Sequence, residues 1–89
     1  MKILTSELYE QQLKDILKDI SVSSYDEAKK FKLYLDTIII NIPTKAKKYK
    51  QSVYIEDKAI KDVEYEGYTI PFFYDEINDT YIILAILIK

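Results

Sequence analysis

The sequence lacks cysteine, histidine and arginine, and it has only one glycine and two prolines in 89 residues. Without cysteine or histidine, disulfides and the usual zinc and iron centres are excluded. Because every basic side chain is a lysine, the two-pronged contact that a guanidinium makes with phosphate is excluded as well. We therefore expect no metal and no other cofactor, and the lack of thiols fits a cytoplasmic protein.

Long hydrophobic segments are also missing. The longest apolar run, residues 82–88, is far short of the roughly 20 residues that a membrane helix requires. The first residues lack the apolar region of a signal peptide. A chain of this length has room for one core, so we expect a single soluble domain over residues 1–89 that contacts no membrane.

Charge is unevenly distributed along the chain. The net charge is -2, which argues against a protein that binds nucleic acid through its whole surface. Between Pro43 and Ile55, however, there are four lysines and no acid. We call residues 45–50 the basic segment, and it lies on an otherwise acidic chain.

Two β-rich runs near the C-terminus organise the predicted fold. Residues 67–75 and 81–88 are separated by a short break with Asn78-Asp79 at its centre, which predicts an antiparallel hairpin. Because residues 82–88 are all apolar, we expect this strand inside the sheet with both faces covered. Residues 60–66 predict another strand, and Gly67 predicts a tight turn after it. Pro71 removes a ladder donor and predicts a bulge or an unpaired backbone position.

The N-terminal half predicts a short strand, residues 2–5, followed by two amphipathic helices. Ser6 is a candidate N-cap, and apolar residues recur at helical spacing as far as residue 20. Ser24 and Glu27 have the spacing of a capping box, which predicts a second helix that ends before Pro43. Residues 44–58 show no sustained period and predict a loop or an irregular edge.

These elements predict an α+β fold with the order strand, helix, helix, strand, strand, strand. The two helices form a hairpin that packs on a small antiparallel sheet. We expect the last strand to lie between the N-terminal strand and the strand of residues 67–75, because both its edges are then paired.

This order, together with several short motifs, resembles the RelE/ParE superfamily. The motifs are the basic segment after Pro43, Ser52-Val53-Tyr54, Ala59-Ile60-Lys61-Asp62, Gly67-Tyr68-Thr69-Ile70-Pro71 and the closing apolar strand. Lys61 stands where relatives usually carry arginine. The resemblance covers nearly the whole chain and implies a RelE/ParE-like fold.

The resemblance also implies a function, the toxin of a bacterial type II toxin–antitoxin system, with growth inhibition and plasmid stabilization as associated effects. It implies a cognate antitoxin that wraps the toxin in a hetero-oligomer. It leaves the target open, because RelE-like members are mRNA interferases that cut messenger RNA on the ribosome, whereas ParE-like members bind DNA gyrase. A degenerate member would bind its antitoxin without toxicity.

The residue types available bear on this choice of target. An endoribonuclease needs groups that activate the ribose 2′-hydroxyl and stabilise the phosphate, and neither histidine nor arginine is present. RelE-like nucleases typically draw a catalytic aromatic or histidine from a tail after the last strand, and this sequence has no such tail. We therefore favour gyrase binding in the ParE manner and assign no catalytic residue. The alternative is an endoribonuclease in which lysines hold phosphate and a tyrosine transfers protons.

Seven residues are candidates for contacting the target or a phosphate. They are Lys45, Lys47, Lys48, Lys50, Lys61, Tyr49 and Tyr54. The lysines have a structural alternative, since lysine runs in loops are commonly solvated and Lys61 can extend its ammonium to the rim of the sheet. Tyr49 and Tyr54 are kept as possible contacts because they lie beside the lysines. Asp75, Glu76 and Asp79 gather near the predicted hairpin turn, where exposed acids are far commoner than metal ligands, so no metal site is predicted.

Overall fold

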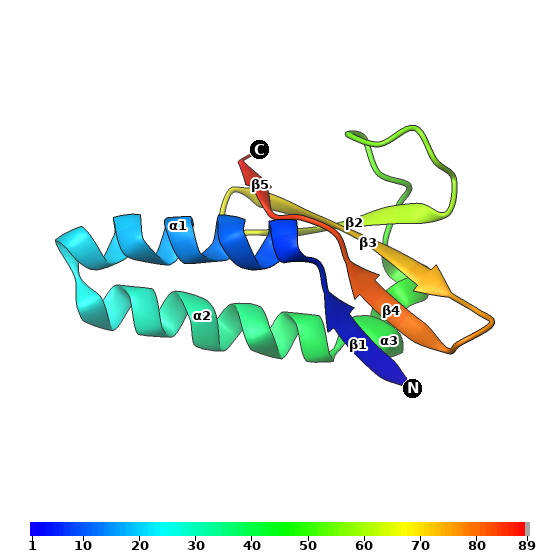
Figure 1. Ribbon diagram of the computed structural model, residues 1–89, viewed down its shortest axis with the longest axis horizontal. Coiled ribbons are helices and arrows are strands. Elements are labelled where there is room, and N and C mark those ends of the chain that lie inside the picture. The colour runs from blue at the N-terminus through cyan, green and yellow to red at the C-terminus, as the bar shows by residue number, and fades with distance from the viewer. Residues whose placement is uncertain (89) are drawn as a thin grey trace.

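The structure is a computed structural model that describes residues 1–88, in which a helical hairpin packs on a twisted sheet (Figure 1). The hairpin consists of α1 (Glu7–Ser23) and α2 (Tyr25–Ile40), which run antiparallel with Ser24 alone between them. The sheet consists of β1 (Lys2–Thr5), β2 (Ile60–Tyr65), β3 (Tyr68–Asp75), β4 (Thr80–Ile83) and the short β5 (Leu87–Ile88). The predicted α+β class is confirmed.

Both helices begin at serine N-caps, as predicted. The Ser6 hydroxyl accepts a hydrogen bond from the backbone N–H of Tyr9 at 2.9 Å, and Ser24 does the same for Glu27 at 3.2 Å. The backbone N–H of Ser24 donates to the carbonyl of Ile20. Because that N–H is already used to end α1, the predicted capping box is wrong in its second half, and Ser24 acts as a simple N-cap.

The second helix ends before Pro43, as predicted, but Pro43 also lies in the first turn of a short helix that was not predicted. α2 ends at Ile40, and a short helix, α3 (Ile42–Lys45), follows with Pro43 in its first turn. A proline fits there because the first helical turn needs no intrahelical donor. A 3₁₀ turn, η1 (Ala46–Lys48), continues from it, so the first part of the predicted loop, residues 44–48, is helical.

The strands lie in the order β1-β4-β3-β2, so β4 is paired on both edges as predicted. β3 runs antiparallel to β2 and β4, whereas β1 runs parallel to β4. The sheet is therefore mixed, and the prediction of a wholly antiparallel sheet is wrong at β1. Glu66 and Gly67 both have positive φ, 49° and 83°, which gives the tight turn between β2 and β3 that was predicted at Gly67.

The predicted last strand, residues 81–88, is interrupted. Phe72 of β3 pairs with Ile83 of β4, and Thr69 of β3 pairs with Leu87 of β5. Between these two pairs, residues 70 and 71 of β3 lie opposite residues 84–86, so the segment between β4 and β5 has one extra residue. This is a bulge opposite Pro71, as the proline predicted, and the backbone N–H of Leu84 donates to the Pro71 carbonyl at 2.9 Å. The bulge turns β5 alongside α1, where the side chain of Gln12 accepts a hydrogen bond from the N–H of Ile86.

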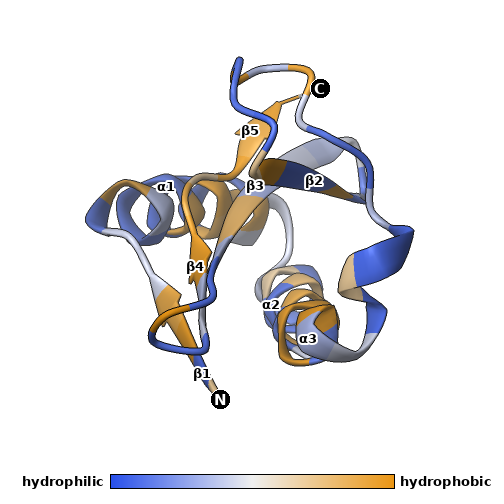
Figure 2. Ribbon diagram, turned by 90° about the vertical axis from the view of Figure 1, so that its right-hand side faces the viewer, coloured by the Kyte–Doolittle hydropathy of each residue, from blue (hydrophilic) through white to orange (hydrophobic). Residues whose placement is uncertain are grey.

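One hydrophobic core lies between the helical hairpin and one face of the sheet. Its buried members are Tyr9, Leu13, Leu35, Ile39, Ile42, Val63, Ile70, Phe72, Tyr81, Ile83 and Ile86. Figure 2 shows the hydrophobic β4 and β5 beside α1, and the hydrophilic turn that follows α3. The helices cover only this face, so the prediction that both faces of the last strand are covered is wrong.

Candidate functional site

The face of the sheet that points away from the helices carries a row of apolar side chains. Paired residues in adjacent strands lie on the same face, and the register pairs Leu4 with Ile82, Ile82 with Phe73, and Phe73 with Ile60. Each of the four long strands thus contributes one side chain to a continuous line across the sheet. We call these four residues the outer row.

The outer row is separate from the core. Leu4 is 53% exposed, and Ile60, Phe73 and Ile82 are half-buried, yet none of the four packs against the core cluster. A hollow of about 300 Å³ lies beside the row and is lined by Leu4, Ile82 and polar groups from β1 and the β3–β4 turn. The row is therefore an apolar strip that the chain itself leaves partly open to solvent, which is typical of a surface that binds another protein.

The basic segment lies next to the edge strand β2. Its lysines, Lys45, Lys47, Lys48 and Lys50, are all exposed. The segment is held by Tyr49, whose ring packs edge-on against Phe72 of the core with 5.6 Å between ring centroids. Tyr49 therefore has a packing role whether or not it also contacts a target.

The surroundings of the basic segment carry both signs of charge. Lys48 and Lys50 line a cleft of about 490 Å³ together with Asp62 and Glu64, which project from β2. Carboxylates so placed repel the phosphates of a nucleic acid. This cleft is therefore better suited to a protein surface of mixed charge than to an RNA backbone.

Lys61 is engaged inside the protein. Its ammonium donates a hydrogen bond to the backbone carbonyl of Ala46 at 3.0 Å, which ties β2 to the turn that carries the basic lysines. The side chain shares its strand face with Val63 and Tyr65, and its ammonium reaches a backbone carbonyl, whereas the sequence suggested that it extends to the rim of the sheet. Its role as a target contact stays a prediction.

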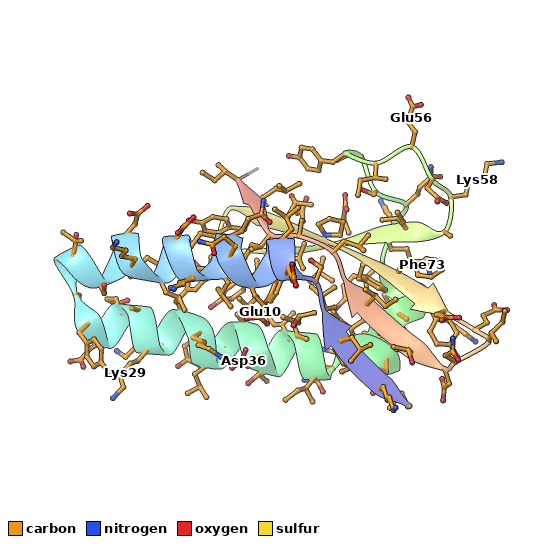
Figure 3. All side chains as sticks on the ribbon, in the orientation of Figure 1. Glu10, Lys29, Asp36, Glu56, Lys58 and Phe73 are labelled. Atoms are coloured by element: carbon orange, nitrogen blue, oxygen red, sulfur yellow. The ribbon has the colours of Figure 1, made fainter. Side chains whose placement is uncertain are left out.

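The loop before β2 is shaped by two side chains that sequence reasoning did not single out for this role. Ser52 is buried, and its hydroxyl accepts hydrogen bonds from the N–H groups of Tyr54 and Ile55. Asp62 accepts from the N–H of Val53 at 2.9 Å. Val53 is consequently held 84% exposed and Tyr54 47% exposed, at a loop whose Glu56 and Lys58 project outward (Figure 3).

The tyrosines and acids near the β3–β4 turn form a structural cluster. The Tyr74 hydroxyl donates to Asp79 at 2.7 Å, and this bond raises the pKa of Tyr74 to about 12 and lowers the pKa of Asp79. Asp75 accepts two hydrogen bonds from Asn78, from its side-chain amide and its backbone N–H, which lower the pKa of Asp75. Within residues 1–88, no group of three or more acids is arranged to hold a metal ion.

The predicted and observed candidates overlap only in part. The structure places Lys48, Tyr49 and Lys50 together at the β2 edge, with Tyr54 on the adjoining loop, while Lys45 ends α3 and Lys47 lies in η1. It adds the outer row, which sequence reasoning missed because its four members are far apart in the chain. The available signal was the strand register, which brings Leu4, Phe73 and Ile60 onto one face with Ile82.

Among the described residues, no helix is long and apolar enough to cross a membrane.

Comparison with known proteins supports the fold. No protein-family model and no curated protein sequence matches the chain. A chain from the chromosomal ParDE TA system of P. aeruginosa is similar in structure, with a TM-score of 0.78 and 15% sequence identity. The similarity covers 99% of this chain and 95% of that chain. The RelE/ParE-like fold that the sequence resemblance implied is therefore confirmed.

Proposed function

We propose that this protein is the toxin of a bacterial type II toxin–antitoxin pair and that it acts by binding a target protein, with DNA gyrase as the target. The fold supports the first part, because 99% of the chain is similar in structure to a chain of a ParDE TA system. The fold alone does not specify the target, so the choice of a protein target rests on the surface of the molecule, and gyrase is the protein that the resemblance to ParE-like members implies.

The outer row is the observation that carries the choice. Protein interfaces have an apolar centre with a polar rim, and the outer row offers apolar side chains from four strands with Lys2 and Asp75 at its border. A nuclease site needs cationic and proton-transferring groups. Leucine, isoleucine and phenylalanine supply neither.

The remaining candidates also favour a protein target. Lys61 is bonded to a backbone carbonyl, and Lys48 and Lys50 share their cleft with two carboxylates. Burial raises the pKa of Tyr9, and burial also raises the pKa of Tyr65, which moves both phenols away from the neutral range where general acids and bases work best. Cleavage of messenger RNA is therefore the second choice.

A toxin of this class is accompanied by an antitoxin, and both act in the cytoplasm. The partner of this protein is accordingly an antitoxin that binds it in a hetero-oligomer and neutralises it. The assignment follows from the sequence resemblance and from the TA system to which the structural neighbour belongs.

The test compares the wild-type protein with a variant of the outer row, Leu4→Lys/Phe73→Lys. We expect the purified wild type to inhibit supercoiling by gyrase and to arrest growth when it is induced, and the variant to lose both effects. Val22→Lys is the control, because Val22 is an apolar side chain that is 84% exposed in the last turn of α1 and belongs to no strand of the sheet. Circular dichroism would establish that both variants are folded.

Other results would overturn the proposal in distinct ways. Codon-linked cuts in cellular messages, mapped by primer extension after induction, would establish the endoribonuclease alternative. Unimpaired growth during expression of the folded wild type would favour a degenerate member that binds an antitoxin only. Equal inhibition of gyrase by the wild type and the Leu4→Lys/Phe73→Lys variant would remove the outer row from the site.

A further inference from the structure

The loop that leads into β2 continues the outer row past the edge of the sheet. The isolated bridge between Gln51 and Lys61 sets the register of this loop on β2. In that register Ser52 lies opposite Ile60, and the Ser52 N–H donates to the Ile60 carbonyl at 2.8 Å. Because Ile60 belongs to the outer row, Ser52 lies on the same face. From Leu4 on β1 to Ser52, the four strand spacings span about 19 Å.

Residues 53–55, which we call the loop tip, are held by two side chains at its base. The buried Ser52 hydroxyl accepts hydrogen bonds from the N–H groups of Tyr54 at 3.2 Å and Ile55 at 3.3 Å. The Oδ2 atom of Asp62 accepts from the N–H of Val53 at 2.9 Å. Every backbone donor of the loop tip is thus engaged, so the tip loses little further conformational entropy when it binds a partner.

Asp57 ties the other end of the loop as it returns to β2. Its N–H donates to the carbonyl of Ile55, and its carboxylate accepts from the N–H of Ala59 at 2.9 Å. Its carbonyl accepts from the N–H of Ile60 at 3.0 Å. The loop is therefore anchored on both sides of the tip, although residues 52–59 belong to no helix or strand.

The side chain of Asp62 is not explained by stability alone. Its second oxygen, Oδ1, is buried and has no hydrogen-bond partner among the described residues. A buried acceptor without a donor destabilises a protein, so its presence calls for another role. The bond from the Val53 N–H to Oδ2 supplies that role, because it fixes the position from which the Val53 side chain projects.

Val53 projects on the same side of the sheet as the outer row. It is 84% exposed and lines the cleft of about 490 Å³ together with Asp62 and Glu64. Asp62 and Glu64 share the face of β2 that carries Ile60, because alternate residues of a strand point to one side. Tyr54, 47% exposed, follows Val53 in the chain, and Figure 1 shows the loop projecting beyond β2.

We infer that the loop tip is an anchor of the target-binding surface, which inserts Val53 and Tyr54 into an apolar pocket of the target protein, and that Ser52 and Asp62 are its positioning residues. The inference rests on the proposed function, and it adds a second contact to the same interface. Tyrosine is enriched among the residues that dominate binding energy, and a preformed loop reduces the entropy lost on binding.

The size of the outer row supports a second contact. Three of its four side chains are half-buried, so the row alone offers less apolar surface than the roughly 800 Å² that each partner contributes to a stable protein interface. Val53 and Tyr54 enlarge that surface at the end where Ile60 lies. Lys48 and Lys50 then lie at the polar rim.

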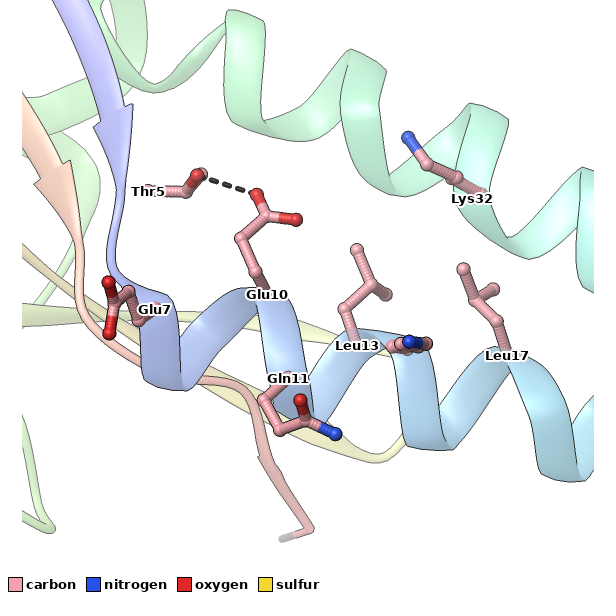
Figure 4. A pocket seen from close by; sticks show the side chains of 8 residues that line it. Thr5, Glu7, Glu10, Gln11, Leu13, Leu17 and Lys32 are labelled. Carbon is pink, nitrogen blue, oxygen red and sulfur yellow. Dashed lines mark hydrogen bonds between the residues drawn. The ribbon is translucent and has the colours of Figure 1, made fainter.

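The hollow between α1 and α2 offers no such anchor. It has a volume of about 640 Å³, and Figure 4 shows Glu10 hydrogen-bonded to Thr5 within it, with Leu13 and Leu17 projecting from α1. Leu13 is buried in the core and Leu17 packs against the core, so the protein itself already uses both side chains. Val53, in contrast, belongs neither to the core nor to the residues packed against it.

The test replaces Val53 by lysine and compares it with a second valine of equal exposure. Val22 is also 84% exposed, in the last turn of α1, so Val22→Lys makes the same chemical change away from the sheet. We expect purified Val53→Lys to require at least roughly tenfold more protein than the wild type to inhibit supercoiling by gyrase, and Val22→Lys to match the wild type. Growth arrest at matched expression should follow the same order.

The positioning role of Asp62 has its own test. Asp62→Ala removes the acceptor for the Val53 N–H, whereas Asp62→Asn keeps an oxygen that can accept it. We expect inhibition to weaken in Asp62→Ala and to be largely restored in Asp62→Asn. Amide hydrogen exchange of Val53 should become faster in Asp62→Ala while exchange in β4 stays unchanged. Faster exchange at both places, without rescue by Asp62→Asn, would mean that Asp62 acts only through general stability.

Equal inhibition and equal growth arrest by the wild type and Val53→Lys would overturn the inference and leave the proposed function in place. Stronger growth arrest by Val53→Lys would also overturn it, because a lysine added beside Lys48 and Lys50 strengthens binding to phosphates. If the wild type arrests growth without inhibiting gyrase, the choice of gyrase is wrong, and growth arrest by the two lysine variants decides the inference in the same way. A folded wild type that does not arrest growth would overturn both.

Discussion

The ammonium of Lys61 donates a 3.0 Å hydrogen bond to the backbone carbonyl of Ala46, and this single contact links the edge strand β2 to the turn that carries the basic segment. The two residues are 15 positions apart in the chain. Lys61, which the sequence resemblance alone equates with an arginine, therefore has an internal role here, and the first prediction follows from it.

Lys61→Met keeps the length of the side chain and removes the donor to Ala46. We expect the free energy of unfolding to fall by about 1 kcal/mol, the usual net contribution of one hydrogen bond. Urea unfolding measures the loss, and Lys58→Met, at an exposed loop position, is the control. A growth arrest that is abolished with stability unchanged would mean that Lys61 contacts the target directly.

Tyr74→Phe removes the hydrogen bond to Asp79, and we expect the pKa of Asp79 to rise toward its ordinary value of 3.8. In the wild type, this bond lowers the Asp79 pKa, so its contribution to stability is present above pH 3.8 and is lost as the pH falls below that value. The same bond raises the Tyr74 pKa from 10.0 to about 12, so its contribution is lost as the pH rises from 10.0 through 12.

Carboxyl-carbon NMR titration of Asp79 checks this prediction, with Tyr34→Phe as a control on the exposed side of α2. If Asp79 titrates identically in the wild type and in Tyr74→Phe, then the N-terminal ammonium, 3.4 Å from Asp79, determines its pKa instead.

The two N-cap serines should differ in their contribution to stability. The Ser6 hydroxyl accepts from the N–H of Tyr9 and also donates to the carbonyl of Leu84 at 2.6 Å, whereas the Ser24 hydroxyl makes only the capping bond, which it accepts from the N–H of Glu27. We expect Ser6→Ala to cost about 2 kcal/mol and Ser24→Ala about 1 kcal/mol. Thermal or urea unfolding measures both, with the exposed Ser23→Ala as control. Equal losses would mean that the bond to Leu84 contributes nothing net.

A substitution in the turn between β2 and β3 should increase the stability of the protein. Glu66 has φ of 49°, a conformation that asparagine tolerates better than glutamate, and Asn-Gly is the preferred pair for a turn with two positive φ values. We expect Glu66→Asn to stabilise the protein by about 0.5 kcal/mol. Gly67→Ala should destabilise it by about 1 kcal/mol, all from the backbone, since an added Cβ meets nothing within 4 Å. A higher melting temperature for Gly67→Ala than for wild type would contradict this account.

The parts of the fold that depend on neighbouring residues could be predicted well. Ser6 and Ser24 start helices because a cap is decided by its own side chain and the next turn. Pro71 induces a bulge because it lacks a donor wherever it is placed. The position of β4 inside the sheet followed from its continuous apolar run.

The features that were not predicted correctly depend on contacts between residues far apart in the chain. The short helix α3 was missed, because Pro43 is compatible with both the end and the beginning of a helix, and Ile42 of α3 is fully buried in the core. The parallel direction of β1 is equally absent from local signals, since residues 2–5 carry no mark of the strand with which they pair. In both cases, contacts with distant residues decide between local alternatives.

The sequence by itself determined the class of fold, the two helices with their caps, the central apolar strand and the absence of thiol, imidazole and guanidinium chemistry, because each depends on residue type or on spacing within one element. Only the tertiary structure decided which side chains meet. Leu4, Ile60, Phe73 and Ile82 form one row through strand register, and Lys14 and Lys29 face one groove through the packing of two helices. Contacts between distant parts of the chain bring these residues together. Because the residues are far apart in the sequence, their proximity could not be predicted from it.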